Sequence, residues 1–315
     1  MAQPNLTLSS MQPAVGQVFE TLTSAELPPG NSGPNQVYDM SAATTGSGPT
    51  FTMVQPNTAP GATNFPAANA CADNDGLSYT FQQYTGQGAF ELGMEIPGNG
   101  RTVYTNAIQY HKFPLAFNTN WTDSYQGNTD FMGSTGTITG TLSAVADGYG
   151  TLVLPWGTVT DVLRLRVERD ETAVVMGITT ETNLLFHYYL KAGVPMPVAQ
   201  RLIRTVTGPG GTQQVGSLTY LTENSMQVGL AETEAGIPLG LFPVPAHDRL
   251  HVSLSDGAIA SIRVNDVTGR ELPVPLPTPG ARELVLDVSA WAGGTYLVRV
   301  LDSNGRAAVR TIAVH

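Results

Sequence analysis

The chain has 315 residues, of which 41% are hydrophobic and only 13% are charged, and it contains 34 glycines and 22 prolines. This length accommodates about two domains. Frequent glycine and proline exclude long helices and favour short strands joined by turns, so we expect an all-β protein. The sequence has no run of 18 or more apolar residues, and hydropathy therefore predicts no membrane-spanning helix.

The formal net charge of −10 is carried by the first three quarters of the chain. Residues 1–238 contain 8 basic and 18 acidic side chains, whereas residues 239–315 contain 7 of each. An acidic surface repels phosphate groups, so we expect no nucleic-acid partner. Cys71 is the single cysteine, which excludes an internal disulfide and a cysteine-based metal cluster.

Strand predictions for the first part of the chain rest on alternating apolar and polar side chains. Residues 90–96 read F-E-L-G-M-E-I, and residues 163–167 read L-R-L-R-V after a predicted turn at 155–157. Both patterns predict a strand with one buried and one solvated face. Regularly spaced short strands predict an antiparallel β-sandwich or jelly-roll-like domain over residues 1–230. Its further strands are predicted at 17–22, 51–54, 172–180, 184–190, 201–207 and 214–221.

A linker is predicted at 231–240, where the sequence A-E-T-E-A-G-I-P-L-G has small residues, two acids and no strand pattern. The remaining residues, 241–315, have the size of one small β-domain. Turns such as D-V-T-G-R at 266–270 separate its expected strands. These strands are predicted at 249–254, 261–266, 282–288, 295–301 and 307–314.

Three motifs in this last part carry a resemblance to a known family. They are F-P-V-P-A-H-D-R-L at 242–250, I-R-V-N-D-V-T-G-R-E-L at 262–272 and L-D-V-S-A-W-A-G-G-T-Y-L-V-R-V at 286–300. In this order, at the C-terminal end, they resemble the type A sorting domain of type IX secretion in Bacteroidetes. The departures from the family pattern are Val244, Trp291 and Arg310. The residues that carry the resemblance are Pro243, Pro245, Asp266, Gly269, Arg270, Gly294 and Tyr296.

The motif residues also have a physical interpretation of their own. Gly269 and Gly294 are expected where the chain needs positive φ or a tight reversal. Tyr296 is expected to bury its ring while its hydroxyl reaches a backbone partner. Both features would stabilise a folded domain, and a sorting signal must be folded to be recognised.

The resemblance implies an immunoglobulin-like sandwich and a function in secretion. It implies passage through the periplasm to the cell surface or the medium, recognition by a shuttle of the translocon, and removal by a surface sortase. The exposed linker, with Glu232, Glu234, Gly236 and Gly240, is then the candidate cleavage segment, because a protease needs extended backbone. Residues 147–166, D-G-Y-G-T-L-V-L-P-W-G-T-V-T-D-V-L-R-L-R, also resemble a segment of cargo proteins of this pathway.

Motifs for catalysis are sparse in the first part of the chain. G-x-S-x-G, H-E-x-x-H, P-loop and G-x-G-x-x-G patterns do not occur in the sequence. His111 and His187 are the histidines of residues 1–238, and a surface or satisfied strand histidine is the favoured interpretation of each. Four residues of strand separate Glu91 from Glu95 by about 13 Å, too far for a glycosidase pair. We predict no catalytic residue, with a hydrolase as the less favoured alternative.

Two further patterns predict binding. Residues 104–131 combine aromatic side chains with Asn, Thr and Asp, so Tyr110, Trp121 and Tyr125 are candidates for stacking on a glycan or a matrix ligand. Core packing is the favoured interpretation of the same aromatic residues, because large side chains dominate protein cores. Asp73 and Asp75, in D-N-D-G, most simply form a turn, and a structural calcium ion is the weaker interpretation. We expect no other cofactor.

Overall fold

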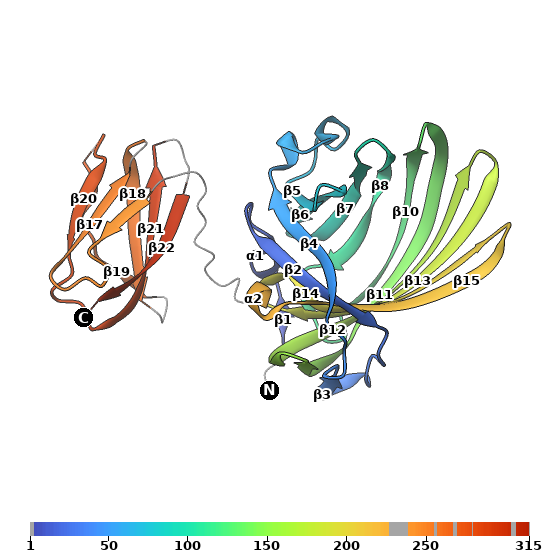
Figure 1. The fold of residues 1–315 in the computed structure, drawn as a ribbon, viewed down its shortest axis with the longest axis horizontal. Helices are drawn as coiled ribbons and strands as arrows, with labels where there is room; N and C mark the ends of the chain where they lie inside the picture. Colours follow the sequence, from blue (N-terminus) through green and yellow to red (C-terminus); the bar gives the residue numbers. More distant parts are fainter. Residues whose placement is uncertain are drawn as a thin grey trace. The chain divides into compact units, whose positions relative to one another are not determined.

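The computed structural model describes residues 3–226, 239–254, 257–266, 270–278, 280–303 and 307–314. The chain forms two compact units, Met1–Gly229 and Leu230–His315 (Figure 1). Each unit is described by itself. The part of the predicted linker from 231 to 238 lies outside the described residues, and with it the candidate cleavage residues Glu232, Glu234 and Gly236.

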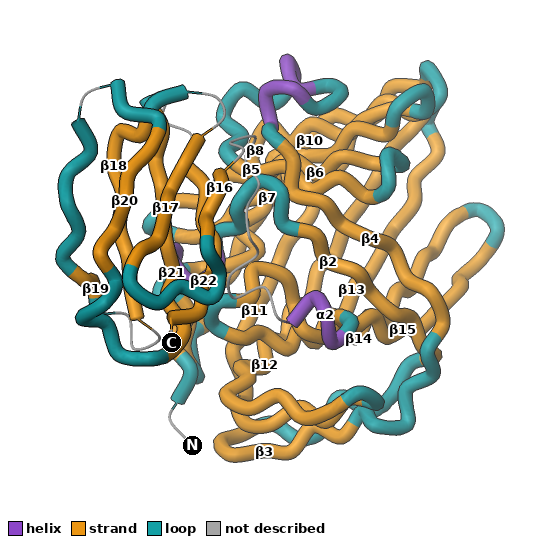
Figure 2. Tube along the Cα trace, turned by 60° about the vertical axis from the view of Figure 1, so that its left-hand side comes forward, coloured by secondary structure: helices purple, strands orange, loops and turns teal. Residues whose placement is uncertain are grey.

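The prediction of an all-β protein is confirmed, since strands make up 68% of the structure and helices 5% (Figure 2). The helices of the described residues are α1 (Leu8–Met11), α2 (Glu223–Met226) and the 3-10 turns η1 (Pro56–Thr58) and η2 (Ala62–Asn64). None of the helices in the described ranges is both long and apolar enough to cross a membrane. The strands of the N-terminal unit are β1 (Asn5–Leu6), β2 (Val18–Ala25), β3 (Gly33–Asp39), β4 (Gly46–Val54), β5 (Ala70–Asn74), β6 (Ser78–Thr85), β7 (Gly88–Ile96), β8 (Gly100–Lys112), β9 (Leu115–Ala116), β10 (Asn120–Phe131), β11 (Ser134–Leu154), β12 (Gly157–Val175), β13 (Ile178–Lys191), β14 (Val194–Gly208) and β15 (Gly211–Leu221).

One closed, barrel-like sheet forms the N-terminal unit. Its strand order is β10-β8-β7-β6-β5-β4-β2-β15-β14-β13-β12-β11, and β10 also pairs with β11 to close the ring. All these pairings are antiparallel, and β3 adds to β11 in parallel beyond the end of β10. The predicted two-sheet sandwich is therefore wrong for this unit. Alternation predicts strands but not which distant strands pair, and the ring needs β2 to pair with β15 at the other end of the unit, as Thr21 does with Leu221.

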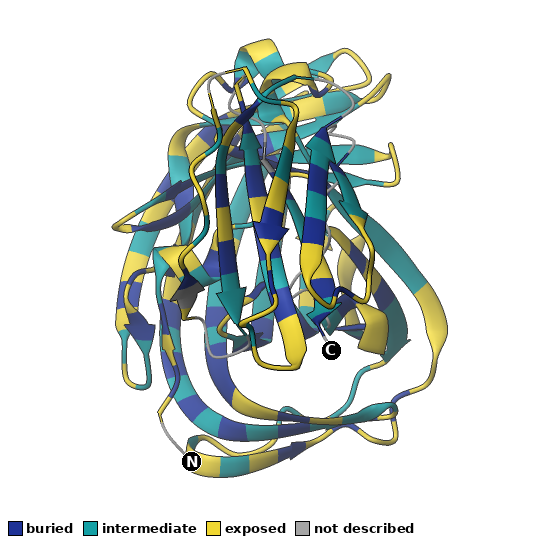
Figure 3. Cartoon of the chain, turned by 90° about the vertical axis from the view of Figure 1, so that its left-hand side faces the viewer, coloured by how far each residue is buried: buried dark blue, intermediate teal, exposed yellow. Residues whose placement is uncertain are grey.

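Buried and exposed residues alternate along the strands, as Figure 3 shows. On β12 the prediction for Leu163, Leu165 and Val167 is confirmed, because all three are buried in the main core. Arg164, predicted to face solvent, is buried as well. At this end of the sheet the outer face is covered, so both faces of β12 are shielded from water.

Residues 26–39, which we call the strap, form this cover. Arg164 holds Asp147 with two bonds, from Nε to Oδ1 at 2.8 Å and from Nη2 to Oδ2 at 2.9 Å. Its Nη1 donates to the carbonyl oxygens of Pro29 and Gly30 in the strap, at 3.0 and 2.8 Å. Arg201 donates from Nε to the Leu27 carbonyl at 3.0 Å and also binds the Glu26 carboxylate. Two buried arginines therefore fasten the strap to the sheet.

The strap makes the stability of the N-terminal unit sensitive to Arg164. Arg164→Gln should lower the free energy of unfolding by about 3 kcal/mol, because it leaves the Asp147 carboxylate and two strap carbonyls without their partner. Urea unfolding measures this loss. Arg166→Gln is the matched control, since Arg166 pairs with Glu168 at 2.7 Å in a partly exposed position, and its loss should stay below about 1 kcal/mol. Equal losses in the two variants would contradict the role of the strap.

The C-terminal unit has two sheets that share one hydrophobic core, which includes Leu250, Val264, Leu286 and Val300. One sheet has the order β16-β17-β20, and the other β19-β18-β21-β22. Each of the five predicted strands coincides with an observed strand to within two residues, while the predicted immunoglobulin-like topology stays a prediction. The strands are β16 (Leu239–Phe242), β17 (Arg249–Leu254), β18 (Ile259–Asp266), β19 (Glu271–Leu272), β20 (Glu283–Asp287), β21 (Gly294–Asp302) and β22 (Ala307–Val314).

Candidate functional site

The middle motif of the C-terminal unit contains the segment D-V-T-G-R, which begins at Asp266 and ends at Arg270. Asp266 and Arg270 enclose it with three contacts: the Asp266 amide donates to the Arg270 carbonyl at 3.0 Å, the Arg270 amide to Asp266 Oδ1 at 3.1 Å, and Arg270 Nε to Oδ2 at 3.0 Å. These contacts hold the two ends of the segment together. Gly269, predicted to give the turn its reversal, lies outside the described residues.

The opening motif ties the start of the unit to its last strand. Pro243 and Pro245 follow cis peptide bonds, and Ala246 directly after them donates its amide to the Ala313 carbonyl at 2.8 Å. Ala246 is fully buried and bridges to Val314 in parallel. The opening motif and the last strand, β22, therefore meet in one place.

The late motif supplies an aromatic pair, of which Tyr296 is buried and Trp291 is partly buried. The Tyr296 ring is buried and its hydroxyl donates to the Ala292 carbonyl at 2.6 Å, which confirms the prediction made for this residue. Trp291, a departure from the family pattern, packs on Tyr296 with 5.0 Å between ring centroids. The reversal predicted at Gly294 is wrong, because Gly294 is absent from the described residues with positive φ and begins β21 opposite Val314.

These three motifs fall in one stretch of chain that matches a family model. Residues 240–315, about a quarter of the chain, match the secretion system C-terminal sorting domain. Residues 240–315 are a type IX sorting domain. No curated protein and no solved structure shows a significant match to the chain.

The sorting domain begins in paired backbone. Gly240, predicted as the end of the linker, lies in β16 and pairs with Ser253. The end of the predicted linker is therefore wrong by two residues. The segment L-G-L-F forms the strand β16, and the small residues before it gave no strand pattern from which its start could be predicted. Backbone from Leu239 to Phe242 is held in a sheet.

The aromatic residues predicted to bind a ligand lie within the N-terminal unit. Trp121 is 7% exposed and Tyr125 2%, and Tyr110 packs against the same core. The Trp121 indole donates to the Gln109 carbonyl at 2.9 Å. A ring must be exposed to stack on a sugar, so the geometry gives Trp121 and Tyr125 a packing role instead.

Tyr125 belongs to a polar cluster on the inner face of the closed sheet. Its hydroxyl donates to Glu171 Oε2 at 3.0 Å, and Arg169 Nη2 lies 3.2 Å from the same oxygen. A Cβ at Gly140 would collide with the Tyr125 ring, so glycine is required there. Burial raises the pKa of Tyr125 to about 12 and raises the pKa of Glu91, which Arg169 opposes in both cases. Tyr125, Arg169 and Glu171 therefore satisfy one another within the N-terminal unit.

Both candidate histidine bases are buried. Burial lowers the pKa of His111 to about 4. Burial, with help from Arg164 and Arg201, lowers the pKa of His187 to about 4. Both imidazoles are therefore neutral at pH 7. The prediction that they are surface or satisfied strand residues is half met: His187 Nδ1 lies 3.4 Å from Arg201 Nη1, whereas the buried His111 Nδ1 has no hydrogen-bond partner among the described residues.

Burial of His111 predicts a pH dependence of stability. Because its pKa is about 6.5 in an unfolded chain and about 4 in the folded one, the unfolded state takes up the proton first as the pH falls. The contribution of neutral His111 to the free energy of unfolding is fully present above pH 6.5. It is lost progressively toward pH 4, by up to about 3 kcal/mol. Urea unfolding between pH 7 and 4.5 should show a smaller fall for His111→Leu than for the wild type. Parallel profiles would contradict this assignment.

Asp73 and Asp75 serve a hairpin turn. Asp73 Oδ1 accepts from the Gly76 amide at 2.7 Å, and Asp75 Oδ2 accepts from the Thr50 amide at 3.0 Å. These bonds favour the turn interpretation. Across the described ranges, no group of three or more His, Cys, Asp or Glu side chains is placed to hold a metal ion, and structural calcium stays a prediction.

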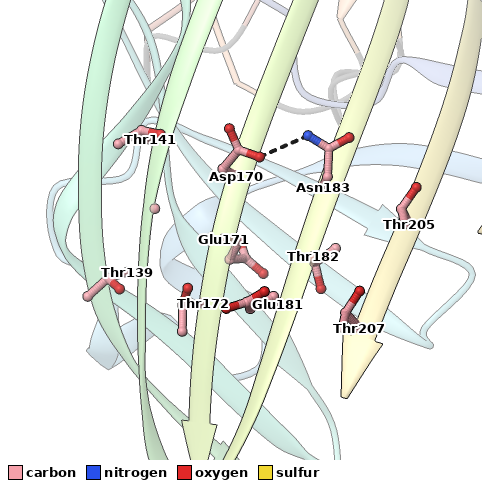
Figure 4. A pocket seen from close by; sticks show the side chains of 11 residues that line it. Thr139, Thr141, Asp170, Glu171, Thr172, Glu181, Thr182, Asn183, Thr205 and Thr207 are labelled. Atoms are coloured by element: carbon pink, nitrogen blue, oxygen red, sulfur yellow. Dashed lines mark hydrogen bonds between the residues drawn. The ribbon is translucent and has the colours of Figure 1, made fainter. Parts of the chain in front are cut away.

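A groove of about 480 Å³ crosses the outer face of β11 to β14 (Figure 4). Thr141, Asp170, Asn183 and Thr205 stand opposite one another on four successive strands. Asn183 Nδ2 donates to Asp170 Oδ1 at 2.9 Å. Sequence reasoning missed this groove, although T-G-T-I-T-G-T at 135–141 places a threonine on one face at every second residue. Its remaining lining residues are Thr139, Gly140, Glu171, Thr172, Glu181, Thr182 and Thr207.

Proposed function

We propose that the protein is cargo of the type IX secretion system, in which the sorting domain is the address and residues 1–229 are the delivered part. The match of residues 240–315 to the sorting-domain family carries this proposal. The partners are the shuttle of the translocon and a surface sortase. The route leads through the periplasm to the cell surface or the medium.

The proposal includes removal of the sorting domain after export. The support is the division of the chain into two compact units around residue 229. A protease needs backbone that can be drawn into its active site, and paired backbone begins at Leu239 in β16. Cleavage therefore falls before Leu239, and Gly240 is no longer a candidate.

Deletion of residues 239–315 tests the address. In the native host the truncated chain should stay in the periplasm, because the translocon has no domain to recognise. Cell fractionation locates the chain. When the full-length chain is expressed, mass spectrometry of the exported product should give the mass of a chain that ends before Leu239.

A fusion of residues 227–315 to an unrelated periplasmic protein is the control for sufficiency, and it should reach the surface or the medium. Normal delivery of the truncated chain would overturn the cargo proposal. An exported product that keeps its full mass would overturn removal alone.

The proposal assigns no catalytic role to residues 1–229. The support is the position of His111 and His187, which are buried and neutral at pH 7. A general base must reach the proton that it abstracts. A binding or structural role of the delivered part fits these positions better than hydrolysis.

Glycan binding is the second candidate, now at the groove of Figure 4 in place of the buried aromatic residues. Hydroxyl, amide and carboxylate groups line the groove, and such groups hydrogen-bond the hydroxyls of sugars. The Asp170 carboxylate and the Asn183 amide both line the groove and already orient each other.

A glycan array separates the groove from the buried aromatic residues. Asp170→Asn should lower the signal of a bound glycan at least tenfold, because an ionised acceptor is replaced by a weaker neutral one. Glu223→Gln, on the exposed α2, is the control and should change nothing. An unchanged array after Asp170→Asn would remove the groove as a candidate.

A further inference from the structure

Two neighbouring hairpin tips expose large apolar side chains. In the hairpin of β10 and β11, Phe131 and Met132 are 52% and 73% exposed. In the hairpin of β12 and β13, Val174, Met176 and Ile178 are 37%, 78% and 55% exposed. These five are half of the ten large hydrophobic side chains that are exposed within residues 3–226. The other five are Val15, Val18, Val37, Leu77 and Val215.

The two tips touch and project from the same end of the sheet. Ser134 Oγ lies 3.3 Å from Met176 Sδ, and Gly136 pairs with Val175 across β11 and β12. In Figure 1 they are the green and yellow-green hairpin ends on the right of the N-terminal unit. We call these five side chains, with their turns, the apolar tip.

Both turns place methionine in a conformation that disfavours it. Met132 and Gly133 have φ of 50° and 79°, and Met176 and Gly177 have φ of 52° and 77°. Positive φ at both central residues is the requirement of a type I′ turn, where Asn-Gly and Asp-Gly are preferred. The hairpin of β5 and β6 follows this rule with Asp75 and Gly76, at φ of 50° and 73°.

Elsewhere in the described structure, positive φ outside glycine occurs at asparagine and aspartate. Outside glycine, the described residues with positive φ are Asn35, Asp75, Asn118, Asp161, Met132 and Met176. Asparagine and aspartate tolerate this region through local hydrogen bonds, whereas a methionine gains nothing there. An unfavourable backbone and an exposed apolar side chain thus coincide twice, on tips that touch.

We propose that the apolar tip inserts into the surface of a lipid bilayer with neutral headgroups. Five projecting apolar side chains bury their surface among the acyl chains near the headgroups, as amphipathic segments do. Phe131 pairs with Ser134, and Val175 with Ile178, so the hairpins enter with paired backbone. The unbranched methionines adapt to an irregular apolar surface.

The shape of the tip favours lipid over a protein partner. A stable protein interface buries about 800 Å² on each side and needs a complementary surface, whereas the tip offers two narrow convex turns. Lipid needs no complementary shape. Asp130 directly precedes the tip in the sequence, and its Oδ1 accepts from the Gly133 amide at 3.2 Å within the turn.

Charge decides the kind of lipid. Residues 130–134 and 174–178 contain no lysine or arginine, and residues 1–238 carry 8 basic against 18 acidic side chains. Anionic headgroups therefore repel the N-terminal unit and have no basic side chain in the tip to bind. Neutral phosphatidylcholine is the surface that the tip fits.

The test is flotation of the full chain with phosphatidylcholine vesicles. The double variant Met132→Asn and Met176→Asn should lower the bound fraction at least tenfold, because it removes the two most exposed apolar side chains of the apolar tip. The same variant should keep or raise the urea midpoint, since asparagine suits both turns. Loss of binding together with a stable fold separates insertion from misfolding.

Two further arms decide the proposal. Val37→Thr, on β3 next to Thr151 of β11 and far from the tip, is the matched control and should bind like the wild type. Replacing a third of the lipid by phosphatidylglycerol should weaken binding, and added salt should reduce that loss. Absence of wild-type binding, unchanged binding of the double variant, or self-association that the double variant abolishes without any vesicle binding would overturn the proposal.

Discussion

The pairing of β10 with β11 is the contact on which the N-terminal unit depends. It joins residues 120–131 to residues 134–145 along their whole length and removes the two free edges that an open sheet would expose. Closure leaves an interior that side chains must fill. Leu142 and Ala144 fill part of it. The polar cluster of Tyr125, Arg169 and Glu171 fills another part, and the Tyr125 ring occupies the space that a side chain at Gly140 would take.

Sequence patterns predicted the strands better than their partners. In the sorting domain the observed bounds of β17 and β22 equal the predicted 249–254 and 307–314, because turns and alternation agree there. In the N-terminal unit the predicted strand at 172–180 runs through the turn at Met176 and Gly177. Methionine carries no turn signal, so the pattern gave no reason to stop. The strap rests on contacts such as Arg164 to Pro29, across 135 residues of chain, and the closed ring rests on the pairing of β2 with β15.

The candidate site shows the same limit at the level of single residues. Alternation places Trp121 and Tyr125 on one face of β10 but does not tell which face turns inward. The structure turns them into the core and leaves Ser124 on the outer face, opposite Thr141. Asp266, Arg270 and Tyr296 could be placed from sequence because their partners lie within four residues of them.

A residue that opposes its local structure needs a compensating contact, and the contact shows its role. Arg164 sits on a buried face, and Asp147 and the strap carbonyls compensate it completely within the fold. Met132 and Met176 oppose their turns just as clearly. The contact from Ser134 to Met176 is a weak one, and both side chains remain largely exposed. The described residues of the N-terminal unit therefore do not compensate these two methionines, and insertion into an apolar phase is the contact that we propose in its place.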